Sequence, residues 1–223
     1  DMCGWPVAQD KASMIVDAAL ASGCNLFDTA DVYGRGSSEE MLGRLLRGRR
    51  ERALISTKVL GPMAEGDPGG LSAARIEACL DGSLRRLRTD RVDLYMPHAP
   101  DSRVPLEHTL EALGRAVRAG KIRAWGLSNF PVAAVRAARR AGVPGGPAFV
   151  QAEFSMVARG GEDDWSRLWE ETGIPVLAWS PLAGGLLSGK YLRPDVQGRL
   201  RGSRPFPPYE PARFEALARM LET

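Results

Sequence analysis

Short apolar runs alternate along the chain with longer segments in which apolar positions recur every three or four residues. Short runs rich in β-branched side chains are typical of buried strands, and longer periodic segments are typical of amphipathic helices. We therefore predict strands over residues 25–30, 53–59, 92–98, 122–128, 149–154 and 175–180. We predict helices over residues 11–22, 37–48, 71–87, 105–119, 131–141, 163–172 and 211–221.

Glycine, proline and small polar residues mark where several of these elements begin or end. Pro105 precedes one predicted helix and Gly120 follows it, which is the usual asymmetry of helix ends. Ser37 and Glu40 have the spacing of a capping box, in which the serine caps the first turn and the glutamate reaches back to it. The sequence therefore predicts that Ser37 caps the helix over residues 37–48.

The alternation of strands with helices indicates parallel strand pairing, and two folds are built in this way. One is the doubly wound sheet, and the other is the (β/α)8 TIM barrel. Periodicity does not distinguish between them. A dinucleotide-binding doubly wound sheet carries G-x-G-x-x-G after its first strand, and none of the predicted strands is followed by this motif. The sequence therefore favours the α/β class and the TIM barrel within it.

The predicted strands are fewer than the eight of a complete barrel. The sequence also starts with Asp1 and continues in a pattern typical of a loop. We therefore expect a barrel that lacks its first and last strands in this sequence. Because 223 residues lie within the range of one barrel domain, we expect a single domain over residues 1–223, truncated at both ends.

Composition and charge narrow the class of protein. Hydrophobic residues make up 44% of the chain and charged residues 26%, as in globular proteins with a sizeable core. The sequence has neither a long apolar run nor a signal peptide, and its net charge of +3 is spread among acidic residues. We therefore expect a cytoplasmic protein without membrane or nucleic-acid partners. Cys3, Cys24 and Cys79 are odd in number and widely spaced, which argues against disulfides and a metal site.

Polar residues at the ends of three predicted strands are the candidates for chemistry, because the active site of a barrel lies at that end. Asp28 ends the first strand, and Tyr33 follows it in the loop. Lys58 and His98 end the next two strands. Taken singly, each has a structural explanation. Asp28 can form a turn, Tyr33 can be a loop aromatic, Lys58 can extend to solvent, and His98 can be a core histidine.

Together these side chains suit the reduction of a carbonyl group. Asp28 and Lys58 follow neighbouring strands, so they can form an ion pair. The Lys58 ammonium lowers the pKa of the Tyr33 phenol, which is about 10 in a free side chain, and the phenol can then donate a proton at neutral pH. His98 can hydrogen-bond the carbonyl oxygen and orient it.

The sequence resembles the aldo-keto reductase family over roughly residues 23–191. The resemblance is carried by residues 27–30, 33–34, 38–43, 56–58, 93–98 and 126–130, in order and spacing. It implies NADPH-dependent reduction of a small aldehyde or ketone, with Asp28, Tyr33, Lys58 and His98 as catalytic residues and Tyr33 as the general acid. NADH is the alternative cofactor. Residues 98–101 and 181–187 are most similar to the aflatoxin-aldehyde-reductase branch and its bacterial relatives.

The resemblance also assigns the cofactor and substrate contacts. The nicotinamide carboxamide is assigned to Ser128, Asn129 and Gln151. The nicotinamide ring and pyrophosphate are assigned to Trp179, Ser180, Leu182, Gly184 and Lys190. Trp5 and Met63 are expected to edge the substrate pocket. Two structural alternatives remain open: Ser128 and Asn129 as caps of the following helix, and Lys190 as a surface residue.

Two other functions are compatible with this site. One is a regulatory or binding module that keeps the cofactor pocket with little or no turnover, which potassium-channel β-subunits resemble. The other is a dehydrogenase that runs the same reaction from alcohol to ketone. The intact set of Asp28, Tyr33, Lys58 and His98 favours an active reductase on a small carbonyl substrate, with an oligomeric state that the sequence leaves open.

Overall fold

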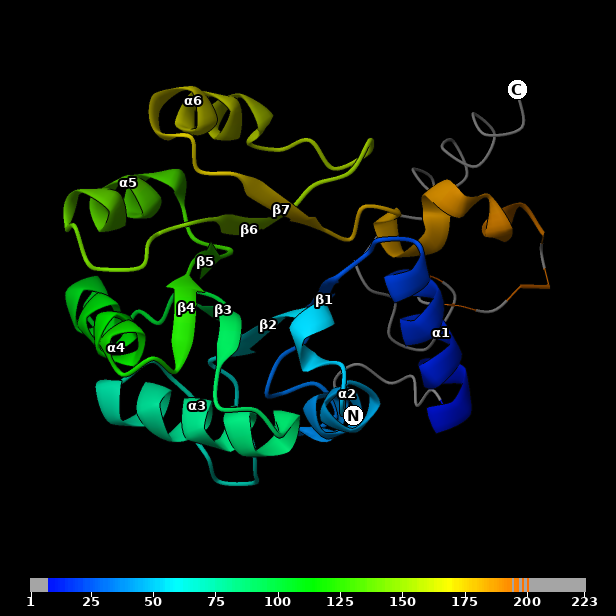
Figure 1. The fold of residues 1–223 in the computed structure, drawn as a ribbon. Helices are drawn as coiled ribbons and strands as arrows, with labels where there is room; N and C mark the ends of the chain where they lie inside the picture. Colours follow the sequence, from blue (N-terminus) through cyan, green and yellow to red (C-terminus); the bar gives the residue numbers. More distant parts are fainter. Residues whose placement is uncertain (1–7, 194, 197, 199, 201–223) are drawn as a thin grey trace. The chain divides into compact units, whose positions relative to one another are not determined.

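The computed structural model describes residues 8–193, 195, 196, 198 and 200 (Figure 1). They form two compact units. One contains the described residues up to Val150 together with Leu168–Pro175, and the other contains Gln151–Arg167 and the described residues from Val176 onward. Trp5 and the helix predicted over residues 211–221 lie outside the described residues. The single domain over residues 1–223 stays a prediction.

The first unit contains most of the alternating strands and helices. In chain order they are α1 (Gln9–Ala21), β1 (Leu26–Asp28), α2 (Ser37–Leu45), the 3₁₀ helix η1 (Arg50–Arg52), β2 (Leu54–Val59), α3 (Ala73–Leu87), β3 (Val92–Pro97), α4 (Leu106–Arg118), β4 (Ile122–Trp125), β5 (Leu127–Ser128) and α5 (Val132–Arg140). Each of these strands and α helices coincides with an element that the hydrophobic pattern predicts.

The four strands β1, β2, β3 and β4 form one sheet in chain order, and each neighbouring pair is parallel. Asp28 of β1 pairs with Ser56 of β2, and Lys58 of β2 pairs with Met96 of β3. Because parallel strands end at the same edge, this register places the residues that follow β1, β2 and β3 at one edge of the sheet. The parallel pairing that the sequence predicts is confirmed.

The remaining elements follow β5 along the chain. They are β6 (Val150–Glu153), α6 (Glu162–Thr172), β7 (Val176–Trp179) and the 3₁₀ helices η2 (Ala183–Ser188) and η3 (Lys190–Leu192). β6 and β7 are hydrogen-bonded neighbours. Within the first unit, Val150 N donates to Pro175 O at 3.0 Å.

The strand predicted over residues 122–128 is interrupted at Gly126. A Cβ atom there would lie 2.5 Å from the Phe149 ring and 2.6 Å from the Phe149 carbonyl oxygen, so only glycine permits this approach. Gly126 N donates to Tyr95 O at 3.1 Å, whereas Leu127 N donates to Phe149 O at 3.4 Å. The chain therefore changes its pairing partner at Gly126, and this change divides the predicted strand into β4 and β5.

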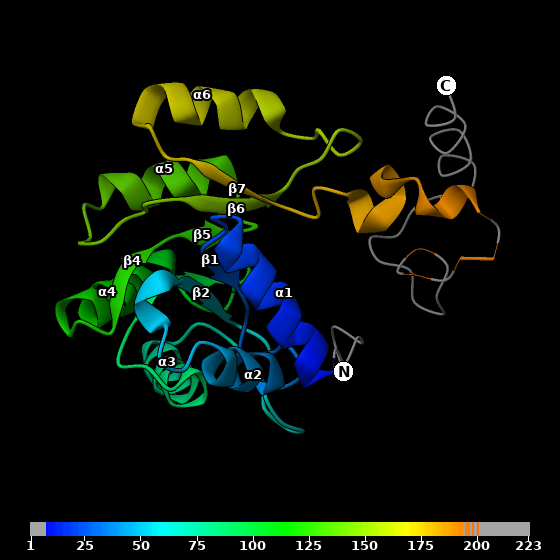
Figure 2. The same cartoon turned by 45° about the vertical axis from the view of Figure 1, so that its right-hand side comes forward.

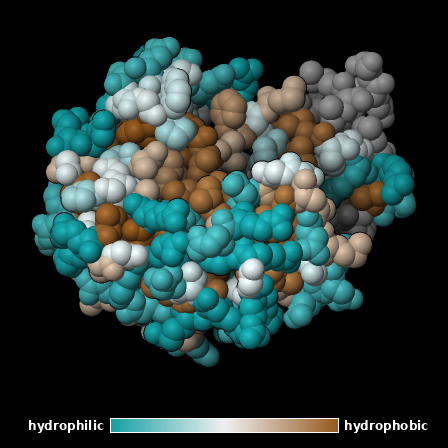
Figure 3. All heavy atoms as spheres, viewed as in Figure 1, coloured by the Kyte–Doolittle hydropathy of each residue, from teal (hydrophilic) through white to brown (hydrophobic). Residues whose placement is uncertain are grey.

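The core of the first unit lies between its sheet and the helices α3 and α4. Ile76 and Leu80 of α3 and Leu110 and Leu113 of α4 are at most 2% exposed. Burying each of these side chains contributes about 1.5–3 kcal/mol relative to leaving it in water. Figure 3 shows mainly hydrophilic residues on the face where α3 lies, as expected for an amphipathic helix.

The N-terminal cap of α2 differs from the sequence prediction, although the helix begins at Ser37 as expected. Its N-cap is Gly36 at φ 92°, and no side chain caps the helix, so the predicted capping box of Ser37 and Glu40 is wrong. Gly34, Arg35 and Gly36 all have positive φ, and this left-handed run brings the chain into the helix one residue earlier than a serine cap would. Ser37 is consequently the first helical residue.

Three further features concern membrane spans, metal sites and cysteines. No helix within the described part of the chain combines the length and the hydrophobicity that crossing a membrane requires. Among the same residues, no group of three or more histidine, cysteine or acidic side chains is arranged to hold a metal ion. Cys24 and Cys79 are free thiols, and Cys3 lies outside the described residues.

Candidate active site

The ends of β1 and β2 hold an ion pair. Lys58 Nζ donates to Asp28 Oδ2 at 2.6 Å and to the carbonyl oxygen of Thr29 at 2.8 Å. The Lys58 side chain is 1% exposed, whereas that of Asp28 is 38% exposed. A buried ammonium is costly unless it is paired, so these two acceptors keep Lys58 charged and fix its position. The predicted pairing of Asp28 with Lys58 is confirmed.

Tyr33 and His98 lie beside this ion pair. Lys58 Nζ is 5.2 Å from the centroid of the Tyr33 ring. The ring centroids of Tyr33 and His98 are 5.7 Å apart, with an edge-to-face angle of 71°. The structure thus brings together the four side chains that the sequence predicts as catalytic. A phenol beside a fixed ammonium and an imidazole can donate a proton to an oxygen that gains negative charge.

His98 is neutral at physiological pH. Its pKa is lowered from 6.5 to about 4, mainly by burial and then by the positive charge of Lys58, while Asp28 partly offsets both effects. A neutral imidazole is a poor proton donor, but its N–H group can still donate a hydrogen bond. His98 therefore suits the orientation of an oxygen atom, and Tyr33 suits the delivery of the proton.

This low pKa predicts a loss of stability in acid. An unfolded chain binds more protons at this histidine between pH 6.5 and about 4, so the stabilising contribution is complete above pH 6.5 and is lost as the pH falls. We expect His98 to account for about 2 kcal/mol of the stability lost between pH 7.5 and pH 5. Urea unfolding of His98→Gln should show a correspondingly weaker dependence on pH.

His108 provides the matched control, because it is the other histidine and is exposed on α4. His108→Gln should keep the pH dependence of the unchanged chain. An equal pH dependence for His98→Gln and His108→Gln would contradict a neutral, half-buried His98.

The loop that carries Tyr33 is tied to β2 through its backbone. Thr29 N donates to Ser56 O at 2.9 Å, and Asp31 N donates to Lys58 O at 3.2 Å. Tyr33 N then donates to Ala30 O at 3.1 Å, which closes a turn. Tyr33 is therefore held close to Lys58 by the main chain as well as by packing.

A second polar network, which the sequence did not predict, includes Thr57, the residue that precedes Lys58 on β2. Glu39 of α2 is fully buried, accepts a hydrogen bond from Thr57 Oγ1 at 2.6 Å and pairs with Arg86 Nε at 2.7 Å. A Cβ atom on Gly43 would lie 2.6 Å from the carbonyl oxygens of Arg86 and Leu87, so glycine lets α2 approach α3. Figures 1 and 2 both show α2 beside α3. The signal in the sequence is the spacing of Glu39 and Gly43, four residues apart on one helix face.

We expect Arg86→Met to destabilise the chain by about 2–3 kcal/mol. The change leaves the buried Glu39 carboxylate without its ion partner, and the cost is below the 3–5 kcal/mol of a fully buried pair because the Arg86 side chain is 22% exposed. Urea unfolding at pH 7 measures the change. Arg85→Met is the matched control, since Arg85 is the exposed neighbour on α3 and should change stability by at most about 0.5 kcal/mol. Equal stabilities of the two variants would contradict this account of Glu39.

Ser128 and Asn129 lie next to the catalytic candidates in the first unit. Asn129 Nδ2 donates to His98 O at 2.9 Å and to Ser128 Oγ at 3.1 Å. Asn129 has a φ of 60°, which asparagine tolerates better than most residues. The N-cap of α5 is Pro131, so the alternative in which Ser128 or Asn129 caps this helix is wrong.

The other predicted cofactor residues belong to the second unit. Gln151 is buried in β6, and Trp179 ends β7 with its carbonyl oxygen accepting from Phe154 N at 3.3 Å. Leu182 is 56% exposed. Tyr191 links two parts of the loop: its hydroxyl donates to Gly184 O at 3.3 Å, and Lys190 Nζ lies 4.8 Å from its ring centroid.

Two features of this loop concern Ser180 and the glycines that follow it. Ser180 Oγ is buried and has no hydrogen-bond partner among the residues that the structure describes, which is unusual for a buried hydroxyl. Gly184 and Gly185 have φ values of 67° and 96°, which favour glycine, and a Cβ atom on Gly185 would lie 2.7 Å from Lys190 Cε. Glycine at position 185 therefore lets the Lys190 side chain lie against the backbone of this loop.

The structure gives less support to the predicted substrate pocket. A groove of about 290 Å³ is lined by residues of β1 and α2 and reaches Asp28. Met63 is half-buried and does not line this groove, and its backbone N–H donates to Asp67 Oδ2 at 2.8 Å. Trp5 lies outside the described residues.

Comparison with known proteins shows which family this chain is similar to. The model of the aldo/keto reductase family matches residues 2–221. The uncharacterized oxidoreductase YrpG of Bacillus subtilis (strain 168) is 37% identical over 213 residues, which cover 88% of this chain and 65% of that protein. A probable voltage-gated potassium channel subunit beta of Oryza sativa subsp. japonica is 32% identical over 194 residues, which cover 83% of this chain and 59% of that protein. The chain thus spans less than two thirds of these relatives.

Solved structures that are similar to this chain include a protein named as an aldo-keto reductase. The glycerol dehydrogenase AKR11B4 from Gluconobacter oxydans matches with a TM-score of 0.83 and 32% identity, over 98% of this chain and 68% of that one. An aldo-keto reductase from Klebsiella pneumoniae in complex with NADPH matches with a TM-score of 0.69 and 30% identity, over 79% of this chain and 60% of that one. The likeness and the parallel β/α order confirm the (β/α)8 barrel class.

Proposed function

We propose that this chain, since it belongs to the aldo/keto reductase family, reduces a small aldehyde or ketone to an alcohol with NADPH. The observation that carries this proposal is the buried Lys58 ammonium, held by Asp28 and Thr29 beside the Tyr33 ring. The Klebsiella pneumoniae neighbour binds NADPH, which favours the same cofactor here.

In this proposal Tyr33 is the general acid. NADPH, when bound, supplies the hydride that the carbonyl carbon accepts. The carbonyl oxygen then gains negative charge and takes the phenolic proton of Tyr33. The adjacent Lys58 ammonium stabilises the phenolate that remains, which makes the phenol a better donor at neutral pH. Asp28 keeps that ammonium in place.

His98 and Asn129 have orienting roles in this proposal. The neutral imidazole of His98 donates a hydrogen bond to the substrate oxygen and aligns it with Tyr33. Asn129 holds the main chain at His98 through its amide hydrogens. The amide and hydroxyl groups of Ser128, Asn129 and Gln151 suit a carboxamide, since they include donors and acceptors.

The loop after β7 is proposed to hold the rest of the cofactor. Trp179 offers a flat indole for stacking on the nicotinamide ring. The Ser180 hydroxyl and the backbone around Gly184 suit phosphate oxygens, and Lys190 adds positive charge. Leu182 is exposed and would be covered by the ligand.

A second candidate function is favoured by one comparison. The Oryza sativa relative is named as a probable potassium channel subunit, so a cofactor-binding module with little turnover is the alternative. The two functions differ in turnover and share cofactor binding.

The test measures both properties of the full chain. NADPH binding is followed by the change in cofactor fluorescence, and turnover is followed by the loss of NADPH absorbance with a panel of aliphatic and aromatic aldehydes, ketones and sugars. We expect binding and steady turnover of at least one carbonyl class. Binding without turnover across the panel would overturn the reductase and support the binding module.

A further inference from the structure

Asp31 is a buried carboxyl group that the proposed chemistry does not use. It lies two residues before Tyr33 and is 0% exposed. Its Oδ1 atom accepts a hydrogen bond from Val32 N at 2.7 Å, and its own N–H donates to Lys58 O at 3.2 Å. Its Oδ2 atom is also buried and has no hydrogen-bond partner among the described residues. Asp31 thus contacts the backbone of the turn that carries Tyr33.

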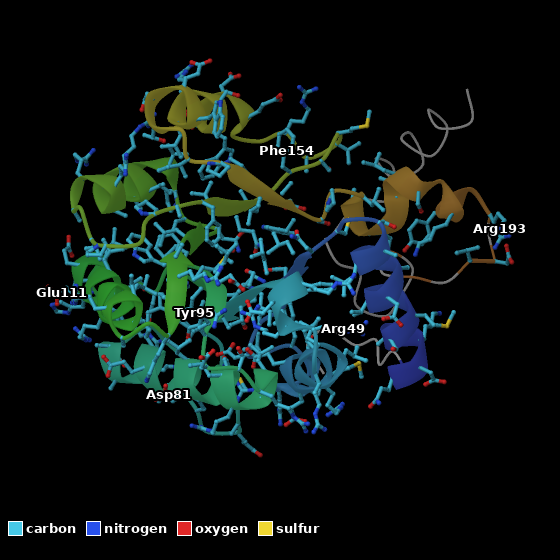
Figure 4. All side chains as sticks on the ribbon, viewed as in Figure 1. Arg49, Asp81, Tyr95, Glu111, Phe154 and Arg193 are labelled. Carbon is cyan, nitrogen blue, oxygen red and sulfur yellow. The ribbon has the colours of Figure 1, made fainter. Side chains whose placement is uncertain are left out.

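Titratable groups from several elements face Asp31 without bonding to it directly. They are Glu39 of α2, Arg75, Cys79 and Arg86 of α3, and Tyr95 of β3. Figure 4 shows Tyr95 on the side of β3 that faces α3. Arg86 bonds to Glu39, and Arg75 bonds to Asp67, so each arginine is already engaged by another carboxylate.

This environment makes the ionisation of Asp31 sensitive to pH near neutrality. Its pKa is raised from 3.8 to about 7, mainly by burial; the Val32 N–H opposes this rise, Glu39 adds to it, and Arg86 and Arg75 lower the pKa slightly. An ionised carboxylate forms a shorter and stronger hydrogen bond with a backbone N–H than a protonated one does. The Val32 contact is therefore stronger when Asp31 is charged.

We propose that Asp31 is a positioning residue for Tyr33: its ionised carboxylate holds the Val32 N–H and thereby fixes the turn from Ala30 to Tyr33. Val32 is the residue between Asp31 and Tyr33, and Tyr33 N closes the turn by donating to Ala30 O. Val32 is joined to Tyr33 by a peptide bond. A change in the strength of the hydrogen bond between Val32 N and Asp31 Oδ1 therefore alters the position of the Tyr33 phenol. The effect on catalysis rests on the proposed function, whereas the effect on the turn does not.

Asp31→Asn tests the proposal because it keeps the shape and an acceptor oxygen but removes the charge. Glu40→Gln is the matched control, since it neutralises an exposed carboxylate on α2. NMR of the full chain follows the Val32 amide proton and the Tyr33 Cζ carbon from pH 5.5 to 8.5. We expect both signals to shift with one midpoint near pH 7 in the unchanged chain and in Glu40→Gln, and neither signal to shift in this way in Asp31→Asn.

Kinetics gives the second measurement. The ratio of kcat for the unchanged chain to kcat for Asp31→Asn should rise about fivefold between pH 6 and pH 8.5, because the unchanged chain forms the charged hydrogen bond only above the midpoint and the variant forms it at no pH. A ratio independent of pH overturns the proposal, since a packing role would lower kcat equally at every pH. A Val32 shift without a Tyr33 shift overturns it as well. If no carbonyl is reduced, the proposed function fails, and the two NMR signals alone decide the role of Asp31.

Discussion

Replacing Tyr33 by phenylalanine should lower kcat for carbonyl reduction by about two to four orders of magnitude. A positioned general acid contributes a factor of this size, and phenylalanine keeps the ring that packs near Lys58 and His98 while removing the proton. Because the hydroxyl is not proposed to bind the cofactor, the Kd for NADPH and the midpoint of urea unfolding should stay nearly unchanged. The loss of NADPH absorbance measures kcat, and cofactor fluorescence measures Kd.

Tyr95→Phe is the matched control for this variant. Tyr95 is fully buried between β3 and α3, where its hydroxyl donates to Ile76 O at 3.5 Å, away from Lys58 and His98. Removing this hydroxyl should leave kcat within about twofold of the unchanged chain. A Tyr33→Phe variant that keeps more than a tenth of the activity would show that another group delivers the proton.

Lys58→Met should lower kcat by about two to three orders of magnitude and should also change its pH dependence. In the proposed function the Lys58 ammonium stabilises a Tyr33 phenolate, and removing one such stabilising group costs a factor of this size. Without it the pKa of the phenol rises, so the pH above which Tyr33 is deprotonated should also rise. Methionine fills the buried space, and Asp28 is 38% exposed, so the fold should survive.

Lys121→Met is the control for the loss of a lysine–aspartate pair. Lys121 bonds to Asp81 at 2.5 Å, but both side chains are more than a third exposed, and a surface pair of this kind contributes at most about 1 kcal/mol to stability. Its kcat should not change. Similar kinetics for Lys58→Met and Lys121→Met would contradict the proposed role of the buried ammonium.

The fold was largely predictable because its strands and helices have strong local patterns. The bounds of α3 and α4 follow from apolar spacing and from the residues at their ends, and they agree with the structure to within two residues. The break at Gly126 was not predictable, because its cause is the Phe149 ring, which is distant in the sequence. The cap of α2 was mispredicted because the positive φ values of Gly34, Arg35 and Gly36 outweigh the local capping pattern.

The candidate site was predictable where its residues follow strands. Asp28, Lys58 and His98 each lie at the end of a parallel strand, so the register alone brings them to one edge. Asp31 and Glu39 were missed, because nothing local shows that a carboxylate in a loop or on a helix is buried. The burial of Glu39 accompanies the close approach of α2 to α3 at Gly43, which tertiary packing determines.

Transfer of deuterium tests the central claim most directly. The full chain is incubated with an accepted aldehyde or ketone and NADPH that carries deuterium on one face of nicotinamide C4, each of the two epimers in turn. We predict that one epimer gives an alcohol with deuterium on the carbinol carbon, that the other gives none, and that Tyr33→Phe nearly abolishes both products. If neither epimer gave an alcohol with deuterium, hydride transfer from the cofactor would be contradicted, and with it the proposed function.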